Sequence, residues 1–287
     1  IPKNANFTKC NINDEEIISK LIQSNKFDVL MHFAGFIQVE ESVKYPQKYF
    51  DNNTENATKL FETCKNNGLN KIVFSSTAAA YGSVNENKLI DENTNLNPQN
   101  PYAESKIKTE NFLFENKHDY KFIILRYFNV AGADKKLRSG QISKRSTHLI
   151  KILSEVVVGK RDHIEIFGND YNTPDGTAIR DYIHVSDLAD IHLEVAKYLL
   201  ESSESNLFNC GYGNGFSVLD VINTANKISG DKIDYKFSNR RDGDVEQLIA
   251  DTSKILKHID WRPKHNDLSE IINSSIKWEE KINESNT

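Results

Sequence analysis

Three short runs of apolar and β-branched residues, separated by helical patterns, constrain the fold of this chain most strongly. The runs are FDVLMHF (27–33), KIVFSST (71–77) and KFIILRYFNV (121–130). Two helical patterns lie between them, at 46–67 and 102–117. Apolar strands that alternate with helices are typical of a parallel sheet covered on both faces. The order of these elements predicts an α/β fold with a doubly wound, Rossmann-like parallel sheet.

The second half of the chain has a looser pattern of short strands and amphipathic helices. Two of its helices are expected to begin with capping boxes, at Ser217-x-x-Asp220 and Asp267-x-x-Glu270. We therefore predict a Rossmann-like domain over 1–131, with part of 168–200 returning to it. A smaller α+β lobe is predicted over 132–287.

Composition restricts the classes of partner. The 36 Lys and Arg and 41 Asp and Glu give a net charge of −5, so we expect no nucleic-acid partner. No apolar run approaches the roughly 18 residues that cross a bilayer, and no leader pattern is present, so we expect no membrane partner and a cytoplasmic location. The 3 cysteines form no CxxC pair and the histidines no HExxH, so no metal is expected.

A Tyr-x-x-x-Lys pattern, Tyr102 and Lys106, lies in the predicted helix 102–117. Side chains four apart on a helix are neighbours, and an ammonium beside a phenol lowers the phenol pKa from about 10, so that Tyr can act as a base. Thr77 ends the strand 71–77, and the carboxyl ends of strands face the ligand in doubly wound folds. The alternatives are an exposed surface pair and a Thr77 hydroxyl that only caps its own turn.

Six segments that span most of the chain carry a resemblance to a known family. The segments are HFAGFIQVEESVKYPQKYFDNN (32–53), FSSTAAAYG (74–82), NPYAESK (100–106), LRYFNVAGA (125–133), IFGNDYNTPDGTAIRDYIHVSDLAD (166–190) and RRDGD (240–244). In this order they resemble the extended short-chain dehydrogenase/reductase family and, within it, the UDP-glucose 4-epimerases.

The resemblance implies an isomerase of galactose metabolism that interconverts UDP-glucose and UDP-galactose, with NAD as a resident cofactor. Tyr102 would take the proton of the sugar 4-hydroxyl while C4 gives its hydride to NAD. Thr77 would hydrogen-bond the same hydroxyl, and Lys106 would tune Tyr102 and hold the nicotinamide ribose. The 4-keto sugar would then turn over and receive the hydride on its other face. Relatives of this kind are often homodimers, so we expect a homodimer, with the helices at 46–67 and 102–117 as candidates for its interface.

The resemblance also implies the binding residues. For NAD they are Asn11, Ile12, Phe33, Ala34, Gly35, Phe36, Ile37, Asn52, Thr77, Tyr102, Lys106 and Phe128. For the UDP-sugar they are Thr77, Tyr102, Asn129, His148, Leu149, Glu165, Ile166, Phe167, Arg180, Arg241, Asp242, Gly243, Asp244 and Leu248. Guanidinium groups suit a diphosphate because they donate forked, charge-assisted hydrogen bonds. The alternative for Arg180 and Arg241 is a surface ion pair with Asp181 or Asp242.

Several positions depart from the family pattern. Asn11 stands where the family has an acidic residue, and Ile37 where close relatives often have Lys. Leu248, of intermediate bulk, leaves open whether an N-acetylated sugar fits. The family's opening G-x-x-G-x-x-G turn, which cradles the NAD pyrophosphate, does not precede Phe27. We therefore expect that the Rossmann-like domain is N-terminally incomplete by about one βαβ unit, that the chain is part of a longer enzyme, and that this chain alone binds NAD poorly.

Two other functions compete with epimerisation. A nucleotide-sugar 4,6-dehydratase or decarboxylase would need a carboxyl group just after Thr77, and Ala78-Ala79-Ala80 cannot transfer protons. A catalytically incomplete nucleotide-sugar-binding fragment is the non-enzymatic alternative. The intact Thr77, Tyr102 and Lys106 favour the epimerase.

Overall fold

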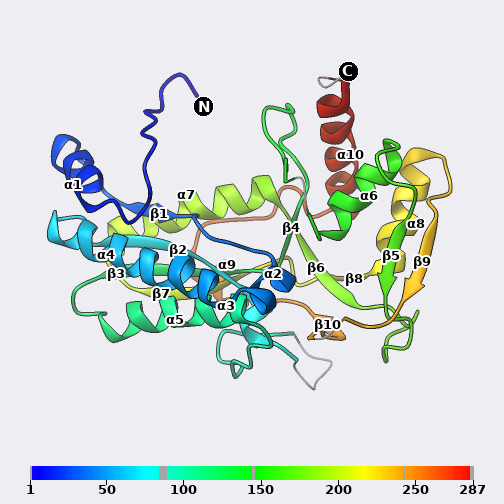
Figure 1. The fold of residues 1–287 in the computed structure, drawn as a ribbon, viewed down its shortest axis with the longest axis horizontal. Helices are drawn as coiled ribbons and strands as arrows, with labels where there is room; N and C mark the ends of the chain where they lie inside the picture. Colours follow the sequence, from blue (N-terminus) through cyan, green and yellow to red (C-terminus); the bar gives the residue numbers. More distant parts are fainter. Residues whose placement is uncertain (1, 84–88, 144–145, 242, 285–287) are drawn as a thin grey trace. The chain divides into compact units, whose positions relative to one another are not determined.

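The computed structural model describes residues 2–83, 89–143, 146–241 and 243–284 (Figure 1). The chain forms two compact units, of which the first comprises 1–76, 100–124 and 196–206, and the second 77–99, 125–195 and 207–287. The functional division at residue 131 remains a prediction. Among the described residues, no helix is both long enough and apolar enough to cross a membrane.

The predicted parallel sheet is present and confirms the α/β fold. Strand β1 (Leu30–His32) pairs in parallel with β2 (Lys71–Thr77), with Met31 opposite Val73. The sheet order is β1-β2-β3-β7, where β3 is Lys121–Tyr127 and β7 is Asn206–Cys210. The interior residues of β2 and β3 are buried, as expected for strands covered on both faces.

The helices of the first unit differ from the prediction in one respect. They are α1 (Glu15–Ser24), α2 (Val39–Lys44), α3 (Pro46–Tyr49), α4 (Asn56–Asn66) and α5 (Pro101–Glu115), and the π-helical turn η1 (Phe50–Glu55) joins α3 to α4. The helix predicted over 46–67 is present as α3, η1 and α4 in direct succession, but it contains a π-helical turn that the prediction did not include. Within η1 the Asn53 carbonyl accepts a hydrogen bond from the Thr109 hydroxyl of α5 at 2.8 Å, so η1 is tied to α5.

The second unit is built on a smaller mixed sheet. Strand β6 (Ile179–His184) pairs in parallel with β4 (Asn129–Ala131) and with β10 (Gln247–Leu248), and antiparallel with β8 (Gly215–Ser217). A separate parallel pair joins β5 (Ile164–Phe167) to β9 (Tyr235–Ser238). The remaining elements are η2 (Ala78–Tyr81), α6 (Leu149–Val157), α7 (Val185–Ser202), α8 (Val218–Ser229), α9 (Ser253–His258) and α10 (Leu268–Glu284).

Two local predictions in this unit are corrected or refined. The run 121–130 is not one strand, because Phe128 is buried between β3 and β4 and donates its N–H to the Cys210 carbonyl at 3.0 Å. The Ser217 capping box is confirmed in full. The second box forms only on one side, since Asp267 accepts from the Glu270 N–H while the Glu270 carboxylate pairs with His265.

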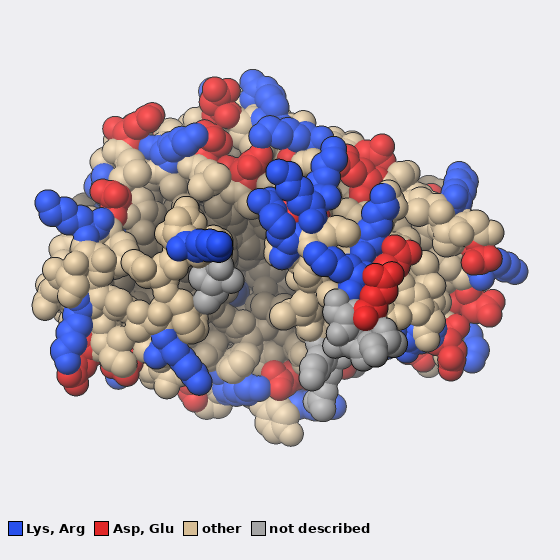
Figure 2. All heavy atoms as spheres, turned by 90° about the horizontal axis from the view of Figure 1, so that it is seen from above, with Lys and Arg blue, Asp and Glu red and all other residues tan. Residues whose placement is uncertain are grey.

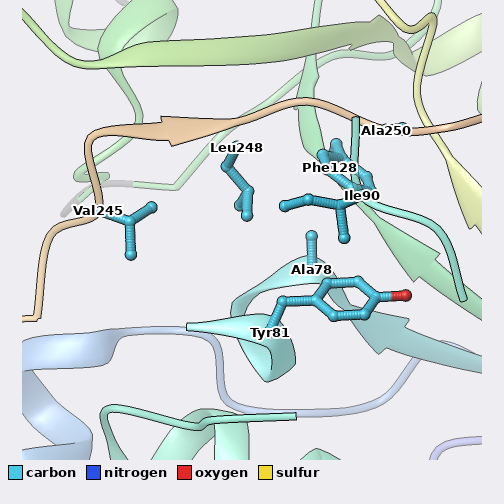
Figure 3. Packing of buried hydrophobic residues seen from close by; sticks show 7 residues of the cluster. All are labelled: Ala78, Tyr81, Ile90, Phe128, Val245, Leu248 and Ala250. Atoms are coloured by element: carbon cyan, nitrogen blue, oxygen red, sulfur yellow. The ribbon is translucent and has the colours of Figure 1, made fainter. Parts of the chain in front are cut away.

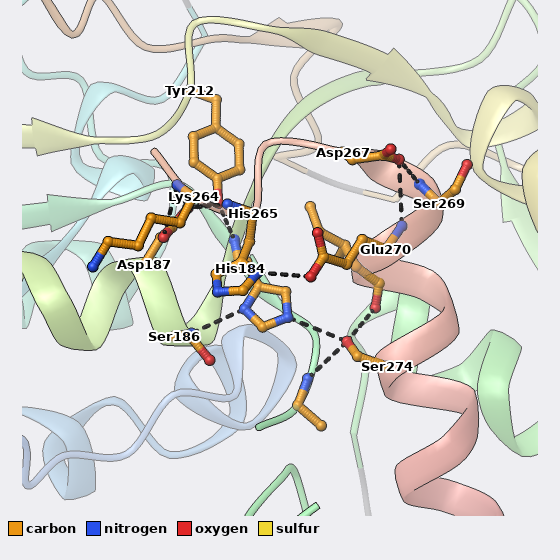
Figure 4. A network of polar contacts seen from close by, with 12 residues as sticks. His184, Ser186, Asp187, Tyr212, Lys264, His265, Asp267, Ser269, Glu270 and Ser274 are labelled. Atoms are coloured by element: carbon orange, nitrogen blue, oxygen red, sulfur yellow. Dashed lines mark hydrogen bonds and ion pairs between the residues drawn. The ribbon is translucent and has the colours of Figure 1, made fainter. Parts of the chain in front are cut away.

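A polar network holds residues 264–274 against the end of β6 (Figure 4). The Asp187 carboxylate accepts the Tyr212 hydroxyl at 2.5 Å and the His265 N–H at 2.9 Å. The rings of His184 and His265 stack at 4.6 Å. Gly132 has φ of 86°, and a Cβ there would lie 2.7 Å from the His184 ring. Only glycine suits both conditions.

Charges of both signs lie on the molecular surface, as Figure 2 shows for one face. A different arrangement occurs between α6 and α10, where Lys151 and Glu279 form a buried ion pair. Lys160 also donates to Glu279, at 2.8 Å. Breaking one side of a buried pair costs more than breaking an exposed pair, because the remaining charge is left desolvated.

We predict that Glu279→Gln lowers the free energy of unfolding by about 3 kcal/mol, because the buried Lys151 then keeps only the Glu155 carboxylate at 3.4 Å and Lys160 loses its partner as well. Urea denaturation measures this. Glu16→Gln is the matched control, since Glu16 pairs with Lys20 on the exposed surface of α1, and it should change stability by less than about 0.5 kcal/mol. Equal effects of the two substitutions would contradict the prediction.

Candidate active site

The segment Phe33–Ile37 leaves the carboxyl end of β1 with a fixed backbone and exposed side chains. Phe33 is 61% and Ile37 52% exposed. The Asn53 side chain accepts the Phe36 N–H at 2.8 Å and donates to the Phe36 carbonyl at 3.0 Å. Its Nδ2 also donates to the Ser105 hydroxyl of α5 at 3.1 Å. One buried amide therefore ties this segment to α5.

Lys106 is buried in α5 and lies beside this segment. Its Nζ donates to the Ser75 carbonyl of β2 at 2.8 Å. Burial lowers the pKa of Lys106 to about 8, and the charge of Glu110 acts in the opposite direction. The alternative for Tyr102 and Lys106 was an exposed surface pair, and the burial of Lys106 excludes it for that residue. Tyr102 lies one turn earlier in α5 and is half-buried, with its ring 6.4 Å from that of Tyr49.

The residues around Gly35 fit a bound dinucleotide. A Cβ at Gly35 would lie 3.2 Å from Lys106 Nζ and 3.3 Å from Asn53 Oδ1, so the backbone here comes close to a cation and a fixed amide. Phe33 and Ile37 offer exposed apolar surface at the end of β1, where ligands bind in this class of sheet. Of the other predicted cofactor residues in this unit, Asn11 is exposed, Ala34 is exposed and Ile12 is half-buried. Asn52 donates to Asn53 at 3.0 Å.

Thr77 closes β2 and is the first residue of the second unit. Its Oγ1 accepts the Ala79 N–H at 3.2 Å and caps η2. The capping role that was considered as the alternative is therefore real. This hydrogen bond uses only the oxygen of the hydroxyl as an acceptor, so the hydroxyl hydrogen can still be donated to a ligand.

Arg180 does not form an ion pair with Asp181, which was the alternative to a role in binding the diphosphate. Its Nη1 donates to the carbonyls of Ile179 at 2.9 Å and Glu246 at 3.5 Å. The neighbouring Asp181 is fully buried and accepts N–H groups of Tyr212 and Gly213 at 2.9 and 2.8 Å. Burial raises the pKa of Asp181 to about 6, while these hydrogen bonds oppose the rise.

Arg241 lies close to three of the predicted substrate residues. Its Nε donates to the Asp244 carboxylate at 2.8 Å, and its guanidinium lies 4.6 Å from the centre of the Phe167 ring. The charge of Asp244 also acts on Arg180, whose pKa is lowered by burial. The two arginines and Asp244 thus form one cluster. Asp242, the other predicted partner, lies outside the described residues, and Gly243 is exposed.

The remaining predicted substrate residues are spread over the second unit. His148 is the residue before α6 and Leu149 its first residue, while Asn129 in β4 lies opposite Tyr182 of β6. In β5 the side chains alternate, so Glu165 is exposed and Ile166 is buried.

Leu248 and Phe128 belong to a buried apolar cluster (Figure 3). Its other members are Ala78, Tyr81, Ile90, Val245 and Ala250. Leu248 lies opposite Arg180 in the register of β10 and β6. The cluster therefore joins a predicted sugar-pocket residue, a predicted cofactor residue and the first alanine after Thr77.

Asn53, Asp181 and Tyr171 were not predicted from the sequence, although each fixes a neighbouring part of the site or lies within it. Asn53 is adjacent to Asn52, to which the resemblance had pointed. The only sequence signal for Asp181 and Tyr171 is their place in the segment 166–190.

Known proteins resemble this chain over nearly its whole length. A family model described as GDP-mannose 4,6 dehydratase matches residues 1–274. A UDP-glucose 4-epimerase of Azospirillum brasilense is 44% identical over 99% of this chain and 82% of its own length. The structure of the UDP-Glc/GlcNAc 4-epimerase of Campylobacter jejuni is 44% identical, with a TM-score of 0.83, covering 97% of this chain and 85% of that one. That of a Bifidobacterium longum UDP-glucose 4-epimerase in complex with NAD+ and UDP is 34% identical, with a TM-score of 0.88, covering 96% and 82%.

We predict that Lys106→Met changes stability in a pH-dependent way. The pKa of Lys106 falls from 10.5 to about 8 on folding, so between these values the unfolded chain holds a proton that the folded chain has lost. The stability of the wild type therefore rises with pH across this window, and that of the variant lacks this rise. The free energy of unfolding of the variant minus that of the wild type should fall by roughly 3 kcal/mol from pH 8 to 10.5. Urea titrations at both pH values measure it, and a constant difference would contradict a desolvated ammonium.

Proposed function

This chain belongs to the UDP-glucose 4-epimerases of the extended short-chain dehydrogenase/reductase family, and we propose that it interconverts UDP-glucose and UDP-galactose with NAD as its cofactor. The observation that carries the proposal is the Tyr102–Lys106 turn of α5, because it combines a phenol with a buried ammonium next to the exposed segment after β1. The 44% identity to a named UDP-glucose 4-epimerase over 99% of the chain supports it.

The residues of the chain supply proton transfer, orientation and cofactor binding. NAD, when bound, would supply the acceptor and donor of the hydride at the sugar C4. Tyr102 takes the proton of the 4-hydroxyl and gives it back, and the Lys106 ammonium stabilises the phenolate form of Tyr102. Thr77, whose oxygen accepts from Ala79, donates its hydrogen to the same sugar oxygen. Phe33–Ile37 and Lys106 hold the cofactor.

The second unit binds the nucleotide part of the substrate. Arg180 and Arg241 meet the diphosphate with charge-assisted hydrogen bonds. Asp244 orients the Arg241 guanidinium, and Phe167 offers a ring face below it. Leu248 borders the sugar, as its place opposite Arg180 suggests.

The segment after Thr77 favours epimerisation over dehydration, although the matching family model is described as a 4,6 dehydratase. Elimination of water requires an acid and a base beside the catalytic hydroxyl. Here Ala78, Ala79 and Ala80 are the first three residues of η2, and none of them can transfer a proton. Inversion at C4 needs no further carboxyl group.

We also propose a homodimer in the cytoplasm. Phe114 is 43% exposed on α5, one of the helices expected at the interface. The described cysteines are all free, as a reducing compartment favours. Light scattering at micromolar concentration should give twice the mass of the 32.8 kDa chain.

We predict that Tyr102→Phe lowers kcat for UDP-glucose at least about a hundredfold, because Phe cannot accept the 4-hydroxyl proton. The dissociation constant for UDP-glucose should stay within about twofold, because Arg180 and Arg241 are unchanged. A coupled assay for UDP-galactose, with NAD added, and calorimetry measure the two quantities.

Tyr45→Phe is the control, since Tyr45 is 61% exposed and the substitution should leave turnover unchanged. Full activity of Tyr102→Phe would refute the assignment of the base. Wild-type protein that binds UDP-glucose but shows no turnover with added NAD would instead support the nucleotide-sugar-binding alternative.

A further inference from the structure

Tyr171 has a buried hydroxyl that no described residue satisfies. It lies in the segment between β5 and β6 and is 4% exposed. Its Oη is buried and has no hydrogen-bond partner in the described part of the chain. Buried hydroxyl groups nearly always have a partner, so an unsatisfied one calls for an explanation. Tyr171 takes no part in the proposed proton and hydride transfer.

The ring of Tyr171 is held firmly, so the hydroxyl has a fixed direction. The Arg240 guanidinium lies over the ring at 4.0 Å. On Gly168, whose φ is 84°, a Cβ would lie 2.6 Å from the Tyr171 ring. Arg240 is itself held, since its Nε donates to Asp170 at 2.7 Å. The backbone N–H of Tyr171 donates to the Gly176 carbonyl at 3.0 Å.

The surroundings of Tyr171 are rich in cations. Burial raises the pKa of Tyr171 and the charge of Asp244 adds to the rise, while the charges of Arg180, Arg240 and Arg241 all oppose it. Two of these arginines are stacked on aromatic rings, Arg240 on Tyr171 and Arg241 on Phe167.

The three arginines differ in their partners. Arg240 and Arg241 each have a carboxylate partner, whereas Arg180 hydrogen-bonds, among the described residues, only to main-chain carbonyls. The cluster therefore has cationic charge that its own acidic residues do not balance with hydrogen bonds. An anionic ligand would complete it.

We propose that the Tyr171 hydroxyl donates a hydrogen bond to the diphosphate of the bound nucleotide-sugar and so is a further substrate-binding residue. The proposal rests on the proposed function, because it takes the nucleotide-sugar as the ligand of this cluster. A phosphate oxygen is an acceptor that explains the unsatisfied donor and suits the Arg180 guanidinium, whose hydrogen bonds within the described residues go to main-chain carbonyls. The aromatic ring then has a second role, as the surface on which Arg240 is ordered.

The test is Tyr171→Phe, which removes the hydroxyl and keeps the ring. Calorimetry with UDP should show a dissociation constant about tenfold higher than that of the wild type, as expected for a lost hydrogen bond to a charged group. The affinity for uridine, measured by competition, should not change because uridine has no phosphate. The melting temperature without ligand should not fall, because no hydrogen bond within the chain is lost.

Tyr81→Phe is the matched control. Tyr81 is also buried, but its hydroxyl donates to Asn209 at 2.7 Å. This variant should melt at a lower temperature than the wild type and bind UDP with unchanged affinity. Tyr171→Phe should therefore lose affinity without losing stability, and Tyr81→Phe should lose stability without losing affinity.

Each other outcome is decisive. Unchanged UDP affinity of Tyr171→Phe would overturn the proposal, and so would an equal loss for UDP and uridine, which would place the hydroxyl on the nucleoside. A wild type that binds both UDP and added NAD but does not epimerise UDP-glucose would overturn the proposed function and leave the contact of Tyr171 with the diphosphate standing. Lack of UDP binding by the wild type would overturn both.

Discussion

The burial of the Lys106 ammonium is the constraint on which the arrangement of the first unit depends. A desolvated cation needs an acceptor and a nearby negative charge, and the Ser75 carbonyl and Glu110 supply them. The backbone of Gly35 comes close to this ammonium, since a Cβ at this position would lie 3.2 Å from Lys106 Nζ, and glycine leaves the space. Asn53 then has to reach from the helical layer to the segment after β1, and the π-helical turn η1 carries it.

In the second unit, cationic groups lie close together although the chain has a net charge of −5. Strand β6 contributes to this by alternation, because Arg180 and Asp181 face opposite sides. Asp181 turns away from the arginine and is satisfied by backbone N–H groups, of which that of Ala250 lies just after β10. The acidic neighbour therefore holds the frame together without neutralising the guanidinium. The local arrangement of side chains around Arg180, rather than the net charge of the chain, therefore determines which ligands can bind there.

The fold was predictable where the signal is local. The strand 71–77 is present with the predicted bounds, because its apolar core Ile72-Val73-Phe74 and its last residue Thr77 favour an extended backbone. The π-helical turn η1 was not predictable, because the helical pattern of 46–67 has no break. The turn is stabilised by the hydrogen bond between Asn53 and Thr109, which are 56 positions apart. Strand β10 has only two residues, so no periodicity can reveal it, and its pairing with β6 depends on residues far away in the chain.

The same distinction applies to the site. Tyr102 and Lys106 were recognisable because their chemistry and spacing lie within one helical turn. Tyr171 was not, since a tyrosine in a polar segment resembles any surface tyrosine until its surroundings are known. In the folded chain its hydroxyl is buried and has no hydrogen-bond partner among the described residues. The charges of Arg180, Arg240 and Arg241 act on the same group. A binding group of this kind is recognised by an unsatisfied hydrogen bond rather than by a motif, because the ligand is the missing half of the pair.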